Sequence, residues 1–289
     1  MIEFIEAMRQ HAFMRHALLT GLLASVACGV IGSYVVVRRI SYIAGGIAHC
    51  VLGGIGAALY LRTVHGWTAL HPTVGAMAAG LAAAVVIGVV TLRARQRQDT
   101  VIGALWAAGT AAGVMFISRT PGYAQDAMSY LFGDILMVTR RDLYLICALD
   151  ACVVIAGLVF YNQFLAVCFD EEFARLRGAS VEGYFVLLLC LAALTIVLLA
   201  TVVGVVMVIA LLTLPAAVAG HFVNRLWHMM VFATLFSMAV TAIGLGASYA
   251  RGLPAGATII VFAAVVYLLV AVGHGVLVRR RSSVARRPG

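Results

Sequence analysis

The chain has 289 residues, of which 64% are hydrophobic and only 11% are charged, and its mean hydropathy is +1.07. This composition excludes a soluble globular domain and indicates a protein embedded in a lipid bilayer. The net charge of +9 comes from arginines that lie between apolar runs and near the C-terminus, so it reports membrane topology and excludes a nucleic-acid-binding patch.

Uncharged stretches of about 20 residues, each long enough to cross a bilayer as a helix, follow one another along the chain. They fall at residues 17–37, 41–61, 72–92, 101–118, 143–165, 183–200, 202–223, 228–248 and 255–278. These windows predict an all-α polytopic membrane protein with about nine transmembrane helices. The windows at 183–200 and 202–223 touch at Thr201, so eight spans is the alternative.

The arginines are distributed unevenly between the two ends of the predicted helices. With nine spans, 13 arginines fall on the side that holds the C-terminus and seven fall on the other. Because arginine-rich loops stay in the cytoplasm, we predict an external N-terminus and a cytoplasmic C-terminus. The predicted parts are an interfacial lead-in helix at 1–16 without signal-peptide features, a transmembrane domain at 17–278 and a basic cytoplasmic tail at 279–289.

The external connection between Arg119 and Asp142 is longer than the others. It contains a compact apolar stretch, Tyr130 to Val138, which is too short to span a bilayer and which we interpret as a surface or re-entrant helix. Glycines are dense inside the spans, as in Gly53-Gly54-x-Gly56 and Gly109-x-x-x-Gly113. This pattern is typical of close helix packing, more often within one chain than across a dimer interface.

Polar side chains in the middle of a span are costly to bury, which makes each one a functional candidate. His49 lies nine residues from Ile40, the predicted inner edge of its span, at a depth of about 14 Å. Cys28 lies nine residues from Val37 and therefore at a similar depth. Both are candidate metal ligands, because zinc favours imidazole and thiolate more than manganese does. The alternative is a histidine bonded to a backbone carbonyl and a cysteine that only packs.

Asp150 lies about seven residues inside its span from the external end. It is a candidate for a proton relay, although a pairing with Arg140 or Arg141, or a protonated carboxyl in the core, is the favoured interpretation. A proton-coupled carrier would usually show several buried acids in a row, whereas the predicted spans of this sequence contain a single acidic residue, Asp150.

The predicted cytoplasmic loop at 168–181 is the most polar connection between spans. Its acidic residues precede its arginines, and a glycine follows them: Asp170, Glu171, Glu172, Arg175, Arg177 and Gly178. A short helix with this order agrees with the helix dipole, and the glycine is a natural stop. Two interpretations stay open, a solvated connector or a helix that docks on a cytosolic partner and passes its motion to the membrane helices.

Five stretches carry recognisable sequence motifs. The specific ones are Arg39–Gly54, which contains His49, and Val203–Ala219, which contains Leu-Leu-Thr-Leu-Pro-Ala-Ala-Val-Ala; Phe132–Leu136, Phe169–Ser180 and Leu253–Thr258 support them. Together they resemble the permease subunits of the zinc, manganese and iron ABC importers, the ABC-3 type. The resemblance covers nearly the whole chain.

The resemblance implies a transport permease of the bacterial inner membrane, not an enzyme. It implies a homodimer that forms the translocation path, two cytosolic P-loop ATPase subunits, an extracytoplasmic metal-binding protein, and no permanently bound cofactor. All 20 basic residues are arginine, and a Walker loop requires lysine, so the ATPase must be a separate subunit. The loop at 168–181 would be the element coupled to that ATPase. A single-chain carrier driven by protons or sodium is the alternative.

The chain departs from the family pattern near His49. Family members often place an Asp four residues before the matching histidine, and Gly45 stands there in this chain. With His49 and Cys28 as the remaining donors, the expected cargo is a divalent transition metal, zinc before manganese or iron. Candidate path-lining or hinge positions are Gly45, Gly53, Gly54, Thr213 and Pro215.

Overall fold

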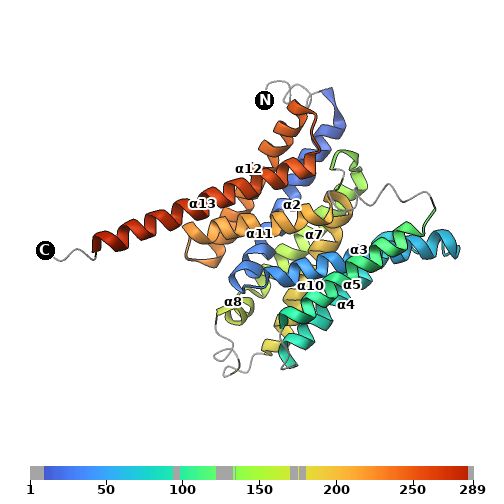
Figure 1. Ribbon diagram of the computed structural model, residues 1–289, viewed down its shortest axis with the longest axis horizontal. Coiled ribbons are helices and arrows are strands. Elements are labelled where there is room, and N and C mark those ends of the chain that lie inside the picture. Colours follow the sequence, from blue (N-terminus) through green and yellow to red (C-terminus); the bar gives the residue numbers. More distant parts are fainter. Residues whose placement is uncertain are drawn as a thin grey trace.

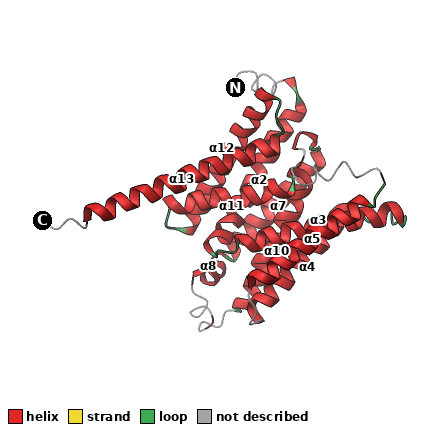
Figure 2. Ribbon diagram, viewed as in Figure 1, coloured by secondary structure: helices red, strands yellow, loops and turns green. Residues whose placement is uncertain are grey.

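The computed structural model describes residues 10–93, 98–121, 133, 135–169, 175 and 180–285. Within these ranges the chain is helical and contains no strand (Figure 2). The helices are α2 (Ala12–Val37), α3 (Ser41–Val64), α4 (Pro72–Arg93), α5 (Gln98–Ser118), the 3-10 turn η1 (Ile135–Met137), α7 (Arg140–Val159), α8 (Tyr161–Phe169), α10 (Val181–Val203), α11 (Val205–Phe222), α12 (Leu226–Arg251) and α13 (Ala255–Ala285).

Nine helices in the described part of the chain are long and apolar enough to cross a bilayer. Each overlaps one predicted window, so the prediction of an all-α protein with about nine spans is confirmed. Gly204 separates α10 from α11 with φ 95° and ψ 147°, a conformation that glycine tolerates and other residues rarely adopt. The windows that touch at Thr201 therefore form two helices instead of one. The orientation of the bundle in the membrane stays a prediction.

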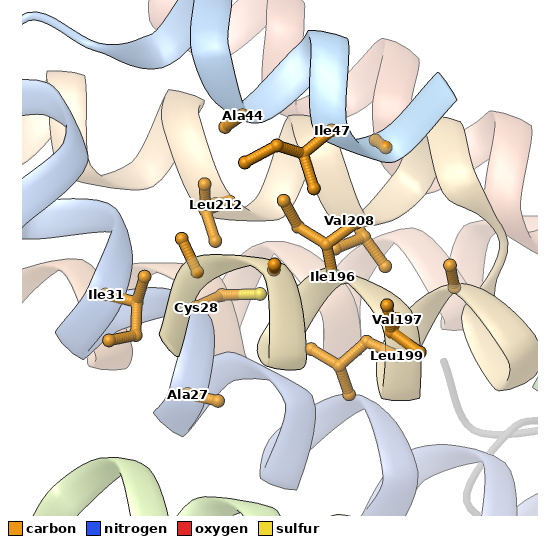
Figure 3. Packing of buried hydrophobic residues seen from close by; sticks show 14 of the residues in the cluster. Ala27, Cys28, Ile31, Ala44, Ile47, Ile196, Val197, Leu199, Val208 and Leu212 are labelled. Carbon is orange, nitrogen blue, oxygen red and sulfur yellow. The ribbon is translucent and has the colours of Figure 1, made fainter. Parts of the chain in front are cut away.

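Helix α2 is the central element of the bundle. It packs against α12, α11, α7 and α10, whereas α3 packs against α5 and α4 in a second group of helices (Figure 1). Helix α10 contacts α4, α3, α2 and α11 and so joins the two groups. Buried side chains such as Ile31, Ile47, Ile196 and Val208 form the shared core between these helices (Figure 3). Helix α13 lies along α11 and α12 and extends beyond the bundle (Figure 1).

Helices α3 and α5 approach closely because glycines face each other across their contact. A Cβ atom on Gly53 would lie 2.9 Å from the carbonyl oxygen of Gly109, and one on Gly56 would lie 2.8 Å from that of Gly113. Gly54 makes a similar approach to Gly75 of α4. These glycines therefore serve helix packing inside one chain, where small residues let backbones meet.

The predicted span at 143–165 differs from the observed helix at both ends. Helix α7 begins at Arg140, because Thr139 and Asp142 form a capping box in which the Thr139 backbone N–H donates to Asp142 Oδ2 at 2.9 Å. It ends at Val159, and the chain bends at Phe160 before the short helix α8. Two polar residues, Asn162 and Gln163, follow this bend, which agrees with a chain that leaves the bilayer there.

Several predicted segments lie wholly or partly outside the described residues. Of the lead-in segment 1–16, residues 12–16 belong to α2, which continues without a break into the first span. Of the apolar stretch 130–138, the described part contains the single 3-10 turn η1. Asp170, Glu171, Glu172, Arg177 and Gly178 of the predicted coupling loop are not described, and Arg175 is exposed. The first residues of the tail at 279–289 continue α13 as far as Ala285.

Candidate functional site

His49 lies in the ninth position of α3 and is half-buried, whereas most of its helix is buried. Its imidazole stacks on the indole of Trp106 from α5, with ring centroids 4.5 Å apart and an interplanar angle of 21°. The His49 Nδ1 atom lies 2.9 Å from the hydroxyl oxygen of Thr110, one turn further along α5. Two side chains of one neighbouring helix therefore fix the orientation of this histidine.

The contacts of the Thr110 hydroxyl favour one tautomer of His49. This hydroxyl donates its single proton to the backbone carbonyl of Trp106 at 2.9 Å, so toward His49 it acts as the acceptor. The Nδ1–H group of His49 is thus the donor, and in the neutral imidazole Nε2 keeps a free lone pair. Metal-binding histidines use the same arrangement, in which one ring nitrogen donates to a protein group and the other binds the ion.

The space beside Gly45 is filled by Trp106. A Cβ atom on Gly45 would lie 2.8 Å from Cζ3 of the indole, closer than such carbon atoms approach. Tyr42, also on α3, contacts the same indole with ring centroids 5.6 Å apart. The absence of a side chain at position 45 is therefore coupled to the presence of tryptophan at position 106, one turn before Thr110.

Cys28 occupies a different environment from His49. Its side chain is fully buried in the apolar core, near Ile31 of its own helix and Ile196 and Leu199 of α10 (Figure 3). The polar and ring contacts of His49 are with α5, and α2 packs mainly against α12, α11 and α7. The two predicted ligands are not brought together, and the role of Cys28 as a ligand stays a prediction.

Asp150 is buried in α7 against α2, where it lies close enough to Cys28 for an electrostatic interaction. Its side chain is 7% exposed, and its carboxyl oxygens make no hydrogen bond of good geometry, although the backbone N–H of Ala27 in α2 lies beside them. The predicted pairing with Arg140 or Arg141 is therefore wrong, since those residues lie at the start of the helix, more than two turns away. An isolated carboxylate is unstable in an apolar core, which leaves the protonated carboxyl as the interpretation that the geometry supports.

Aromatic rings link the short helix α8 to the membrane bundle. Phe164 of α8 is fully buried and meets Tyr34 of α2 edge-on, with ring centroids 5.2 Å apart and an interplanar angle of 73°. Phe164 also contacts Tyr184 of α10, and the Tyr34 hydroxyl donates to the carbonyl of Gly157 in α7 at 3.2 Å. The predicted coupling loop begins at the end of α8, so this cluster ties the loop to three membrane helices.

The remaining predicted hinge residues lie in α11. Pro215 is buried inside this helix, which continues through it from Val205 to Phe222, and the Thr213 hydroxyl donates to the carbonyl of Ile209 at 2.8 Å. Sequence reasoning missed Trp106 and Thr110, although their spacing of four residues in an apolar span places an indole and a hydroxyl on one helix face. That spacing is the sequence signal that could have identified the two residues.

The nine apolar helices of the described residues define a multi-pass membrane protein, and the half-buried, oriented His49 is a polar side chain inside its helical bundle. The model of the ABC 3 transport family matches residues 10–274 of this chain. The chain belongs to the ABC 3 transport family, and it is a transport permease rather than an enzyme.

Several relatives are similar to this chain over almost their whole length. An uncharacterized membrane protein of Synechocystis is 42% identical over 269 residues, which cover 93% of each chain. The manganese transport system membrane protein MntC of Listeria monocytogenes is 32% identical over 267 residues, 92% of each chain. Among solved structures, PsaBC from Streptococcus pneumoniae in complex with Fab superposes with a TM-score of 0.82 at 30% identity, covering 93% of this chain and 95% of that one.

Proposed function

We propose that this chain is the permease subunit of an ATP-driven importer that carries a divalent transition metal into the cytoplasm. The observation that carries the proposal is His49, whose Nδ1 lies 2.9 Å from the Thr110 hydroxyl, an arrangement that would leave the Nε2 lone pair for a metal ion. A polar, oriented imidazole inside a membrane bundle is costly to bury unless it meets a polar cargo. The name of the Listeria relative, a manganese transport protein, supports a metal as that cargo.

The choice between zinc and manganese rests on the ligands near His49. The expectation of zinc depended on a thiolate at the same site, and Cys28 lies in the apolar core instead. A site built from imidazole and water accepts either ion, because first-row divalent metals share nitrogen ligands. We therefore propose a path that admits both zinc and manganese, with the named relative favouring manganese. The ion is cargo, and the proposal includes no resident cofactor.

We propose that two copies of the chain enclose the path and that each contributes His49. One imidazole per chain is a weak ligand, and weak binding suits a conduit because a tightly bound ion would not leave. The close contacts of Gly53 with Gly109 and of Gly56 with Gly113 would let α3 slide along α5 while the ion passes.

The energy for transport would come from partner subunits. The chain contains no lysine and thus no Walker loop, so we propose two cytosolic P-loop ATPase subunits as partners, together with an extracytoplasmic metal-binding protein. The loop at 168–181 would seat on the ATPase. Phe164, packed between Tyr34 and Tyr184, would pass the movement of that loop to α2 and α10.

Transport by the reconstituted complex tests the proposal. The permease and its ATPase, in vesicles with the binding protein supplied outside, should take up radioactive manganese or zinc only when ATP is present on the ATPase side. Charge reversal of both Glu171 and Glu172 should reduce co-purification of the ATPase. Unchanged co-purification would return the loop to the role of a connector.

The single-chain carrier makes the opposite prediction. Vesicles that contain this chain alone should not concentrate metal in response to a proton or sodium gradient. Membership in the ABC 3 transport family disfavours such a carrier, and so does the finding that Asp150 is the one buried acid among the residues that the structure describes. Gradient-driven accumulation by the isolated chain would overturn the proposal.

A further inference from the structure

Two histidines from different helices face each other at one end of the bundle. His221 lies in the last turn of α11, and His274 is the last residue of the apolar span in α13. Their ring centroids are 4.9 Å apart, with an interplanar angle of 38°. His221 is half-buried and His274 is exposed, so solvent reaches the pair.

The pair differs from the other histidines in the described part of the chain. His228 stacks on Trp227, its neighbour in sequence, and His65 contacts Tyr60. His71 Nδ1 lies 3.0 Å from the Thr73 hydroxyl, two residues away. In contrast, His221 and His274 are 53 positions apart in the sequence and bring two imidazoles together across a helix contact.

The spacing of the two rings suits a shared metal ion. With metal–nitrogen bonds of about 2.0–2.1 Å and tetrahedral angles, two imidazoles on one ion have centroids about 5 Å apart. The observed separation of 4.9 Å agrees with this value before any movement of the helices. Water molecules can complete the coordination, because His221 is only half-buried and His274 is exposed.

The position of the pair also favours a cation. The last carbonyl groups of α11 lack partners within the helix, and they give its C-terminal end a partial negative charge beside His221. Helices α11 and α13 run in the same direction, since α12 returns the chain between them (Figure 1). The pair therefore lies at the end of the bundle where α13 leaves it, which is the predicted cytoplasmic face.

We propose that His221 and His274 form a second binding site for a divalent transition metal, separate from His49 and located where the cation leaves the membrane. The choice of cation rests on the proposed function. A bound ion would clamp the end of α11 to α13, and it would thereby restrain the helix that carries Thr213 and Pro215. The site has two protein ligands and is weak, so it fills only when the metal concentration on that face is high.

Zinc binding by the full-length chain tests this site. The probe is the zinc ion alone, measured by equilibrium dialysis on protein in lipid nanodiscs that carries His49→Ala, which removes the other proposed ligand. This protein should bind one zinc ion per chain that is lost on adding either His221→Gln or His274→Gln. Because both imidazoles serve one ion, the double variant should lose no more than either single variant. His228→Gln is the matched control and should leave binding unchanged.

A second measurement requires no substitution in the pair. Zinc should protect His221 and His274 from modification by diethyl pyrocarbonate, as read by mass spectrometry, while His228 stays reactive. Equal zinc binding with and without the pair, or unchanged modification of both histidines, would overturn the proposal. Neither measurement depends on transport, so failure of the importer proposal and failure of this site are distinguishable.

Discussion

The imidazole of His49 is held from one helix at two points, by the indole of Trp106 at its face and by the hydroxyl of Thr110 at Nδ1. The hydroxyl in turn donates to the carbonyl of Trp106, so the three groups form one connected unit. This unit fixes both the ring orientation and the tautomer, and each can be altered separately by substitution.

Loss of the hydrogen bond between Thr110 and His49 should lower metal uptake. Thr110→Val removes the acceptor of the Nδ1 proton but keeps the shape of the side chain, so the imidazole loses its fixed tautomer. We expect metal uptake at limiting concentration to fall by about 10-fold to 100-fold. Thr110→Ser keeps the hydroxyl and should retain most of the uptake. Uptake of the ion into vesicles by the complete transporter is the measurement.

His49→Ala should lower uptake further than Thr110→Val while the complex still assembles. The reason is that His49 is half-buried and makes its contacts at the edge of the core, so its loss leaves the helix packing intact. Co-purification with the ATPase checks assembly. Normal uptake by a well-assembled His49→Ala complex would remove this residue from the translocation path.

Gly45 and Trp106 should behave as a coupled pair. Gly45→Ala places a methyl group 2.8 Å from the indole and should destabilise the protein by about 1–3 kcal/mol. In a Trp106→Ala background the same substitution should be nearly neutral, because the indole is gone. A thermal-unfolding series of the four proteins measures the coupling. Additive effects of the two substitutions would show that the indole is not what excludes a side chain at position 45.

Much of the fold is predictable from the sequence because the bilayer imposes a simple rule. A span must be apolar for about 20 residues, so charged boundaries such as Arg38 and Arg39 mark its ends. This rule did not predict α8 as a separate short helix. Its residues are apolar enough to extend the preceding window. The chain bends at Phe160, whose ring contacts Phe164 and Tyr184, and the contact with Tyr184 of α10 comes from the tertiary fold.

The candidate site is less predictable than the spans. Depth in the membrane singled out His49 and Cys28 equally, because both lie nine residues from a span edge. Depth gives no information on the direction in which a side chain points around its helix. The structure separates the two residues by that direction, with Cys28 in the core and His49 against α5.

Phe164 should be essential for coupling α8 to the bundle. Its ring is fully buried between Tyr34 and Tyr184, so Phe164→Ala should destabilise the protein by about 3–5 kcal/mol. The milder Phe164→Leu fills most of the space and should assemble with the ATPase, yet transport less metal per ATP hydrolysed. Phe169→Ala, in the same helix but 66% exposed, is the control for stability. An unchanged ratio of transport to hydrolysis in Phe164→Leu would mean that the ring only fills space.

A substitution at Asp150 can distinguish whether its carboxyl is structural or serves as a proton relay. Because the side chain is 7% exposed and pairs with no charged group in the described part of the chain, the neutral form is the one that the core accepts. Asp150→Asn mimics that form and should leave thermal stability and ATP-driven uptake close to those of the parent. In comparison, Asp142→Ala removes a capping box at the start of the same helix and should lower the stability by about 0.5–2 kcal/mol. Loss of uptake by a stable Asp150→Asn protein would instead show that the carboxyl must release its proton during transport.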